Sequence, residues 1–339
     1  MSEKQSGFEV QTSQRQSWLS IAAVWAGGMI CVPCLMIGGV LSGGGLSLAE
    51  IVISILIGYG LICVYMIFIG MQACDTGLPV AVMASGALGE KGARYVISTL
   101  IAIACIGWFG IQSATCGQAF ATMTAPLLGM EATTGFVAVC SIIWGTIMLA
   151  TACAGFKGLK WLNYIAVPLL VIVCLYGLIA LVLATWTTNV TNAYSGGLAL
   201  SNLLGFDESK FKITTGISGA IGTLLAAFGL LNAFQGFLSL MSALIPPLAG
   251  VIIAAYWIVG KGKKENFHFS KGVSAAGLIS FIVGALVACI TGGTFASFPG
   301  LVEAMPFLNT PFFVGPVNGI VVSLVLYVIL AAAFPKKAN

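Results

Sequence analysis

Long apolar runs separated by short polar connectors dominate the pattern of hydrophobic and polar positions in this chain. A helix needs about 20 apolar residues to cross the hydrocarbon core of a bilayer, and most of these runs reach that length. They lack the two-residue alternation of a membrane β-strand, so helices are expected, since helices satisfy their own backbone polar groups in lipid. The pattern predicts nine spans, at residues 18–41, 49–72, 95–124, 133–154, 161–186, 213–230, 233–259, 272–292 and 312–334.

The composition also indicates a protein of the membrane. Of its 339 residues, 59% are hydrophobic and 7% are charged, whereas a soluble domain has about 25% charged residues. We therefore predict an all-α polytopic membrane protein, with a cytoplasmic tail at residues 1–17 and a single transmembrane domain at residues 18–334. This composition excludes most soluble enzymes. It also excludes a nucleic-acid-binding protein, which needs a basic patch on a polar fold.

Basic residues gather in five short clusters between the apolar runs. These clusters are Lys91/Arg94, Lys157/Lys160, Lys210/Lys212, Lys261–Lys271 and Lys336/Lys337. Lysine and arginine are enriched in the cytoplasmic loops of membrane proteins. If the N-terminus is cytoplasmic, nine spans place the first two clusters inside and the last three outside. The charge pattern therefore indicates that one span is missing or miscounted between residues 160 and 207.

That stretch is itself ambiguous. Residues 161–186 form one apolar run of 26 residues, which would be about 39 Å long as a helix. The polar segment 187–192, TTNVTN, is typical of a loop, and the weakly apolar segment 193–206 is too short to span a membrane. The residue pattern leaves the path of residues 160–212 open.

The first span contains residues that interrupt helices. Gly27 and Gly28 are followed by Pro33 in the middle of the run, and such a span is expected to unwind and to free backbone carbonyls. Interrupted helices near the bilayer midplane are typical of transporter binding sites. A simple kink against a neighbouring helix is the alternative.

The polar inventory argues against enzyme chemistry. The single histidine, His268, lies in a basic loop, no carboxylate lies in the middle of a span, and no phosphate-binding loop is present. Proton-coupled carriers usually keep an ionisable group within the membrane. Its absence favours a hard cation such as sodium, bound by carbonyl and hydroxyl oxygens, and Thr187 and Thr188 could supply hydroxyls.

The third span carries a candidate for ligand recognition. Trp108 and Gln112 are four residues apart and therefore share one helix face. An indole ring together with an amide suits a flat heteroaromatic ligand, which would stack on the ring and hydrogen-bond to the amide. The alternative is an interfacial tryptophan and a glutamine that bonds across helices.

Several segments resemble the purine/cytosine permeases, which are nucleobase–cation symporters. They are Ile106–Gly110, the Thr187–Asn189 segment after Trp186, Phe237–Ile253, and Leu162–Pro168. The resemblance runs over nearly the whole chain. It implies a fold of two inverted five-helix repeats plus two further helices, twelve spans in all, that works by alternating access.

The resemblance also implies a sodium site. In the family this site uses carbonyls of the broken first helix, which correspond here to Gly27 and Ile30. Helix eight adds one carbonyl and two hydroxyls, which correspond to Ala184, Thr187 and Thr188. The i, i+3, i+4 spacing of these three residues places them on one helix face.

A substrate site is implied in the same way. Trp108 matches the tryptophan that stacks on the base, and Asn189 matches a polar substrate contact. Cytosine-transporting members have a glutamine where this chain has Cys105, and the position of Gln112 resembles the hydantoin-type transporters. An acidic residue common before the tyrosine of helix ten is Ala255 here. The expected substrate is therefore a nucleobase or a related heterocycle.

The chain departs from the family in its length. Residues 18–175 resemble helices one to five and residues 176–334 resemble helices eight to twelve, so helices six and seven and part of five or eight have no counterpart. A loss of three spans would explain the charge pattern, because an odd number of missing crossings inverts every later loop. Helix six normally supplies the second aromatic wall of the base site.

These features predict a secondary transporter of the cell membrane, such as a bacterial inner membrane, and not an enzyme. It would import a nucleobase or related heterocycle together with sodium, with no cofactor besides this ion. The alternative is a shortened paralogue that does not transport and acts as a membrane binding or assembly module. A channel and an intramembrane enzyme are weaker alternatives, and the oligomeric state is left open.

Overall fold

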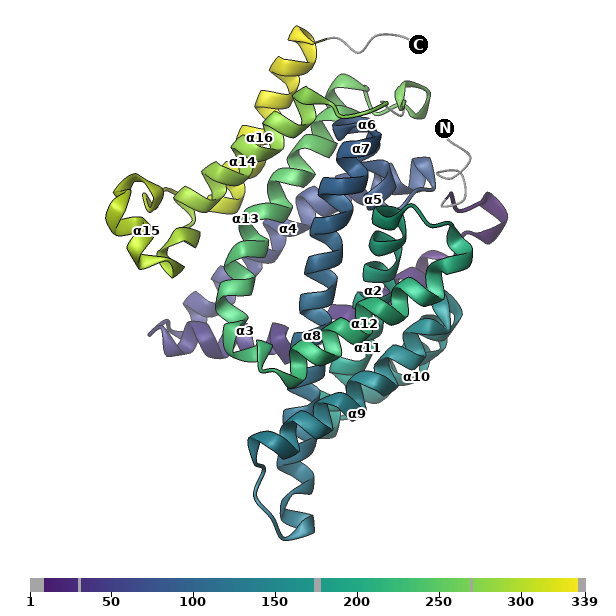
Figure 1. Ribbon diagram of the computed structural model, residues 1–339, viewed down its shortest axis with the longest axis vertical. Coiled ribbons are helices and arrows are strands. Elements are labelled where there is room, and N and C mark those ends of the chain that lie inside the picture. The colour runs from purple at the N-terminus through teal and green to yellow at the C-terminus, as the bar shows by residue number, and fades with distance from the viewer. Residues whose placement is uncertain (1–8, 30–31, 174–177, 269–270, 335–339) are drawn as a thin grey trace. The chain divides into compact units, whose positions relative to one another are not determined.

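The computed structural model describes residues 9–29, 32–173, 178–268 and 271–334. All regular elements in this described part are helical, as the hydrophobic pattern predicts. The chain folds into two compact units, and α4 and α8 each contribute to both (Figure 1). Unit 1 consists of Met1–Thr12, Gly58–Leu100 and Gln235–Asn339, and unit 2 consists of Ser13–Ile57 and Ile101–Phe234.

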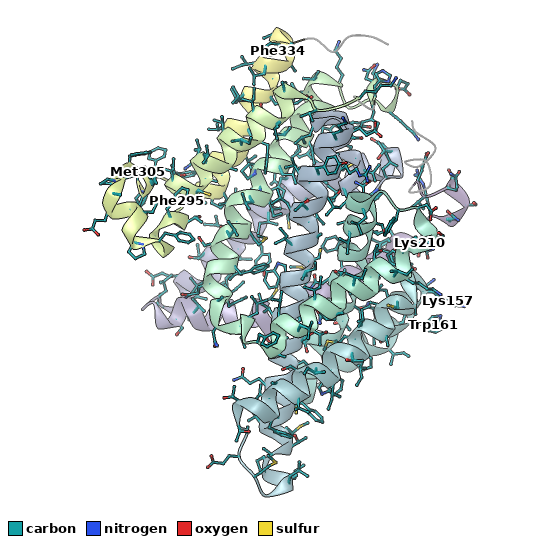
Figure 2. All side chains as sticks on the ribbon, viewed as in Figure 1. Lys157, Trp161, Lys210, Phe295, Met305 and Phe334 are labelled. Carbon is teal, nitrogen blue, oxygen red and sulfur yellow. The ribbon has the colours of Figure 1, made fainter. Side chains whose placement is uncertain are left out.

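Unit 2 is a bundle of apolar helices with short connectors. It contains α2 (Trp18–Met29), α3 (Val32–Gly43), the start of α4 (Leu48–Thr76), most of α8 (Ser98–Thr124), α9 (Thr134–Cys153), α10 (Gly155–Val173), α11 (Leu178–Leu204) and α12 (Phe211–Ala227). The short helices are η1 (Thr12–Gln14), η3 (Pro126–Leu128), η4 (Glu208–Lys210) and η5 (Leu230–Ala233). Lys157 and Lys210 project from the ends of helices in this unit (Figure 2).

Glycines let the helices of unit 2 approach closely. A methyl group added at Gly197 of α11 would lie 2.8 Å from Cα of Thr215 in α12. One added at Gly145 of α9 would lie 3.1 Å from Cβ of Thr223 in α12. Small residues at helix contacts are typical of membrane proteins, where dispersion packing holds helices together in place of the hydrophobic effect. Apolar side chains of α8, α9, α10 and α11 form the core between these contacts.

Unit 1 holds the remaining helices. They are the end of α4, α5 (Val80–Met83), α6 (Ser85–Leu88), α7 (Glu90–Gly92), the π-helix η2 (Ala93–Ile97), α13 (Phe234–Ile253), the π-helix η6 (Ala254–Val259), η7 (Lys264–Asn266), α14 (Ala275–Thr291), η8 (Thr294–Ser297), α15 (Pro299–Ala304), η9 (Pro306–Leu308) and α16 (Gly315–Ala333). The helices α14 and α16 pack along each other through Gly284, Gly319 and Ser323. Pro247 inside α13 contacts the same small residues.

Five helical stretches in the described residues are long and apolar enough to cross a membrane. They are Leu48–Thr76, Glu90–Thr124, Thr134–Cys153, Leu230–Val259 and Gly315–Ala333, and shorter apolar helices occupy Trp18–Met29, Phe211–Ala227 and Ala275–Thr291. Each of these stretches overlaps a predicted span. In the first span, Gly27 and Gly28 lie inside α2, which ends at Met29, and Pro33 lies inside α3, which begins at Val32. Residues 30–31 lie outside the described part, so the predicted unwinding remains a prediction.

The structure shows helices in the region after residue 160, whose path the residue pattern left open. The single span predicted at 161–186 was wrong, because this stretch contains parts of two helices, α10 and α11, which pack against each other. The segment 187–192, whose polar composition is typical of a loop, lies inside α11 and is helical, as the resemblance to helix eight implied for Thr187–Asn189. Threonine and asparagine have weak helix propensity, but in this bundle their side chains find partners on neighbouring helices. Tertiary packing therefore overrides the local preference.

Candidate functional site

Two adjacent threonines of α11 bind backbone carbonyls of α2. The hydroxyl of Thr187 donates to the carbonyl oxygen of Gly27 at 2.6 Å. The hydroxyl of Thr188 donates to the carbonyl of Gly28 at 2.8 Å and to that of Gly27 at 3.3 Å. Thr187 and Gly27 are buried. Four neutral oxygens from two helices thus converge within unit 2.

This set of oxygens has the chemistry of a site for a hard cation. Carbonyl and hydroxyl oxygens are hard ligands, and a glycine carbonyl is accessible because no side chain shields it. Without a cation, the hydroxyl hydrogens point at the carbonyls. A bound cation would accept lone pairs from all four oxygens, and the hydroxyl hydrogens would turn away.

Three of the five predicted ion ligands therefore come together, namely Gly27, Thr187 and Thr188. Ile30 lies outside the described residues, and Ala184 lies in α11 with its side chain outside the described part. Gly28 is an additional partner that sequence reasoning did not assign to the site. The paired glycines in the first span were the available signal, because each lacks a side chain that would cover its carbonyl.

Trp108 lies on α8 beside an aromatic ring that the sequence did not point to. The rings of Trp108 and Phe234 have their centroids 6.1 Å apart at an interplanar angle of 77°, an edge-to-face contact. Phe234 is 9% exposed and begins α13. It lies 126 positions further along the chain, so no local spacing could have joined the two residues.

Buried amides follow Trp108 on the same helix and on α11. Gln112 is fully buried, and neither atom of its side-chain amide has a hydrogen-bond partner among the described residues. Asn189 donates to the Ser113 hydroxyl at 3.0 Å and contacts the Met148 sulfur at 3.1 Å, while its carbonyl oxygen has no partner in the described part of the chain. A buried polar group left unpaired costs about 1–3 kcal/mol. These amides are therefore suited to a ligand that carries both donors and acceptors.

Cys105, the fourth predicted substrate residue, lies at a helix contact. A methyl group added at Gly196 of α11 would lie 3.0 Å from Cβ of Cys105. Cys105 precedes Trp108 by one helical turn, so it extends the same face of α8. Its small side chain lets α11 approach this face closely.

Comparison with known proteins identifies the family. The sequence model of permeases for cytosine/purines, uracil, thiamine and allantoin matches residues 9–177 and 170–315. The chain belongs to this permease family. It is 24% identical to the cytosine permease of Escherichia coli K12 over 367 aligned positions, which cover 78% of this chain and 83% of that protein. It is 25% identical to the hydantoin permease of Microbacterium maritypicum over 265 positions, which cover 67% of this chain and 50% of that protein.

Solved structures confirm the fold of this permease. MHP1, a nucleobase-cation-symport-1 family transporter, matches in its closed conformation with bromovinylhydantoin bound, at a TM-score of 0.75 and 16% identity, over 100% of this chain and 98% of that one. The inward-facing conformation of Mhp1 matches at a TM-score of 0.61 and 17% identity, over 94% and 92% of the chains. The protein is thus an all-helical polytopic membrane protein with the fold of this transporter and is not an enzyme.

The alignment with the E. coli permease also contains residues that have no counterpart in this chain, because it has 367 positions and this chain has 339 residues. The two matches to the family model overlap at residues 170–177, which begin within the end of α10.

The unpaired amide of Gln112 leads to a prediction about stability. Gln112→Leu replaces it by an apolar side chain of similar size, so the ligand-free protein should be as stable as the wild type or more stable by about 1–3 kcal/mol. Thermal unfolding of purified protein in detergent measures this change. Gln118→Leu, six residues further along α8 and exposed, is the control and should have little effect. A clear loss of stability in Gln112→Leu would show that the amide is already paired in the ligand-free protein.

Proposed function

We propose that this permease imports a nucleobase or a related heterocycle together with sodium. The observation that carries the proposal is the buried amide of Gln112, which has no hydrogen-bond partner among the described residues and lies one turn from the indole of Trp108. Flat heterocycles with ring N–H and C=O groups offer the matching donor and acceptor edge, and their faces stack on aromatic rings. The relatives named for cytosine and for hydantoin support this substrate class.

The coupling ion in this proposal binds between α2 and α11. Gly27, Gly28, Thr187 and Thr188 would supply two carbonyl and two hydroxyl oxygens, the ligand type that sodium shares with other hard cations. Asn189 follows directly in α11, so movement of this helix would affect the ion site and the substrate contact together. Such a connection is what coupled binding requires.

We further propose that two helices, the family's sixth and seventh, are absent, and not three. The separate helices α10 and α11 supply the span that the charge pattern required between residues 160 and 207. Residues 18–175 would then correspond to helices one to five and residues 176–334 to helices eight to twelve. With ten crossings, every basic cluster lies on the same side of the membrane as the N-terminus. This agrees with the enrichment of lysine and arginine in cytoplasmic loops if that side is the cytoplasm.

One observation favours the second candidate function, a shortened paralogue that binds or assembles without transporting. In the most apolar window of Leu48–Thr76 only 6% of the residues are buried, compared with 50% in Glu90–Thr124 and 61% in Leu230–Val259. A helix that has lost its packing partners would show such exposure. In that case substrate binding could persist without transport.

Uptake of labelled nucleobases by cells that express the chain, with and without a sodium gradient, tests the leading proposal. Base stacking on an aromatic ring contributes about 1–3 kcal/mol, so Trp108→Ala should weaken apparent affinity by about tenfold or more. Trp161→Ala, at a tryptophan that is 59% exposed, is the control and should transport normally. Absence of uptake by protein shown to be in the membrane, with base binding retained, would favour the non-transporting paralogue.

The ion site makes a separate prediction. Thr188→Val keeps the shape of the side chain but removes its hydroxyl, so sodium should no longer increase base binding while the protein still folds. Thr146→Val removes an exposed hydroxyl that donates to Ile142 within α9 and should leave the sodium response unchanged. Base binding titrated at several sodium concentrations provides the measurement. An unchanged sodium response in Thr188→Val would remove this residue from the ion site.

The number of crossings can be tested by the side on which the C-terminus lies. Ten crossings place both termini in the cytoplasm, whereas nine would place the C-terminus outside. A green fluorescent protein fused after Asn339 should therefore fluoresce, and alkaline phosphatase fused at the same position should be inactive. The opposite result would support an odd number of crossings.

A further inference from the structure

Unit 1 carries a groove that involves none of the residues assigned to transport. It is bordered by the last residue of η6, the end of α16 and the start of α14, and its cavity volume is about 280 Å³. Its lining includes the apolar side chains of Val259, Ala331 and Phe334 and the polar side chains of Asn266, His268 and Ser274. The groove is therefore amphipathic, and Phe334 marks the end of α16 beside it (Figure 2).

The place of the groove in the fold puts it at the membrane surface. The apolar stretches Leu230–Val259 and Gly315–Ala333 are both candidate spans, and both end at the groove. Ser274 caps α14 at the same end, where its hydroxyl accepts the N–H of Gly277 at 3.2 Å. Helices leave the hydrocarbon where they end and the polar loops begin, so the groove lies at the level of lipid headgroups.

Lysines from the loop after η6 and from the short helix α7 gather at this end of unit 1. Lys261, Lys263, Lys264 and Lys271 belong to the loop between η6 and α14, which contains one acidic residue, Glu265. Lys264 forms an ion pair with Glu9 at 3.9 Å. The remaining lysines of this loop exceed its carboxylates in number, so the loop carries net positive charge.

Backbone hydrogen bonds join the helices α6 and α7 to this loop. The N–H of Lys91 donates to the carbonyl of Gly272 at 2.8 Å, and the N–H of Ser274 donates to the carbonyl of Leu88 at 2.7 Å. These bonds bring Lys91 beside the loop that borders the groove. Five lysines from positions about 180 residues apart are thus collected at one end of the unit.

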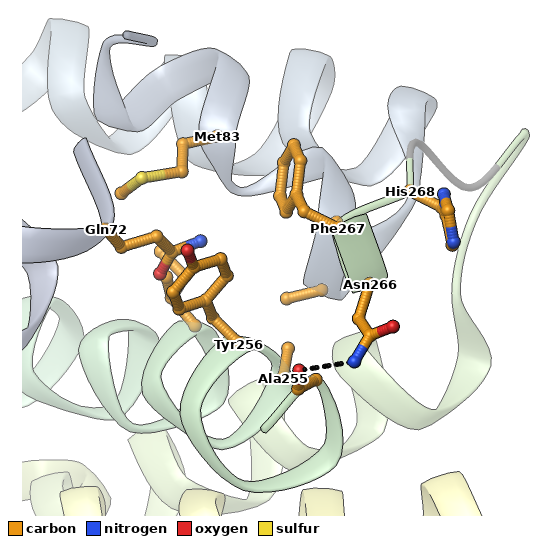
Figure 3. Close-up of a pocket in the computed structure, with 11 residues that line it drawn as sticks. Gln72, Met83, Ala255, Tyr256, Asn266, Phe267 and His268 are labelled. Atoms are coloured by element: carbon orange, nitrogen blue, oxygen red, sulfur yellow. Dashed lines mark hydrogen bonds between the residues drawn. The ribbon is translucent and has the colours of Figure 1, made fainter. Parts of the chain in front are cut away.

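The first part of the loop, residues 260–268, contains a tight turn. Lys261 and Gly262 have φ angles of 56° and 63°, and the amide of Asn266 donates to the Gly260 carbonyl at 3.0 Å (Figure 3). A cavity of about 20 Å³ between Gln72, Tyr256 and Phe267 lies next to this turn. The Asn266 side chain, which lines the groove, is therefore held by the backbone of the turn.

We propose that this groove binds the headgroup of an anionic phospholipid. The lysines and the first N–H groups of α14 would face the phosphate oxygens, and Asn266, His268 and Ser274 would hydrogen-bond to the headgroup. The first part of an acyl chain would lie against Val259, Ala331 and Phe334. The net positive charge favours an anionic headgroup over one that carries an ammonium group.

The proposal can be tested on the purified chain without substrate, so its outcome is independent of transport. Detergent-solubilised protein is titrated with phosphatidylglycerol or phosphatidylcholine, and retained lipid is measured by native mass spectrometry. Each lysine near an anionic surface contributes about fivefold to binding, so the combined variant Lys261→Gln, Lys263→Gln, Lys271→Gln should weaken phosphatidylglycerol binding by at least tenfold. Its control, Lys157→Gln, Lys210→Gln, Lys212→Gln, removes three lysines from unit 2 and should bind normally.

A second pair of variants tests the groove itself. Ala331→Trp fills it and should abolish retention, whereas Ala332→Trp, at an exposed neighbour that does not line the groove, should not. This pair decides the question if the lysine variant fails to fold. Equal retention in the groove variants and their controls would overturn the proposal, as would equal retention of the two lipids by the wild type. Displacement of phosphatidylglycerol by millimolar inorganic phosphate would identify a site for free anions instead and would also overturn it.

Discussion

Hydrogen bonds between the threonine hydroxyls of α11 and the glycine carbonyls of α2 join parts of the chain that lie 160 residues apart. In the hydrocarbon core of a membrane there is no water to form hydrogen bonds with a polar group. Each of these oxygens therefore depends on the other helix for its hydrogen-bond partner. These hydrogen bonds hold the four oxygens close together, so a single cation could contact all four in place of the hydroxyl hydrogens.

Other contacts in unit 2 hold α11 in this position. Gly196 and Gly197 let α12 approach one part of α11, and Asn189 anchors another part to Ser113 of α8. This close packing has a cost, since the hydroxyls of Thr215 and Ser218 have no partner within the described residues. The amide of Gln112, also without a partner among the described residues, differs from these hydroxyls because its donor and its acceptor are two separate atoms on one planar group. Tight helix contacts thus provide a rigid frame in which this amide is left available for a ligand.

The sequence predicted the helical class well, because the length of an apolar run is a local property that needs no knowledge of neighbours. It could also place Trp108 and Gln112 on one face from their spacing alone. The residue pattern left residues 187–192 open, because their polar side chains form a helix with partners on α2 and α8. Phe234 was missed for a similar reason, since its contact with Trp108 joins positions far apart in the chain. The glycine pair at 27 and 28 was visible, but only the structure shows that both carbonyls are used.

If two helices are absent from the middle of the chain, the position of the junction explains why this would be tolerated. The junction would lie between residues 175 and 176, where α10 is followed by α11. The helices α10 and α11 pack against each other, and both also pack against α2. The contacts that form the proposed ion site are therefore made by helices on either side of the junction and do not require the absent segment. An even number of absent crossings also leaves the direction of every later helix unchanged, so positively charged loops keep their side of the membrane.

What such a shortening would remove is packing around α4, whose apolar surface is largely exposed. The edge-to-face pair of Trp108 and Phe234 would still be present. Binding of a flat ligand depends on local contacts, whereas transport depends on movements between helices, so such a shortening would affect transport more than binding.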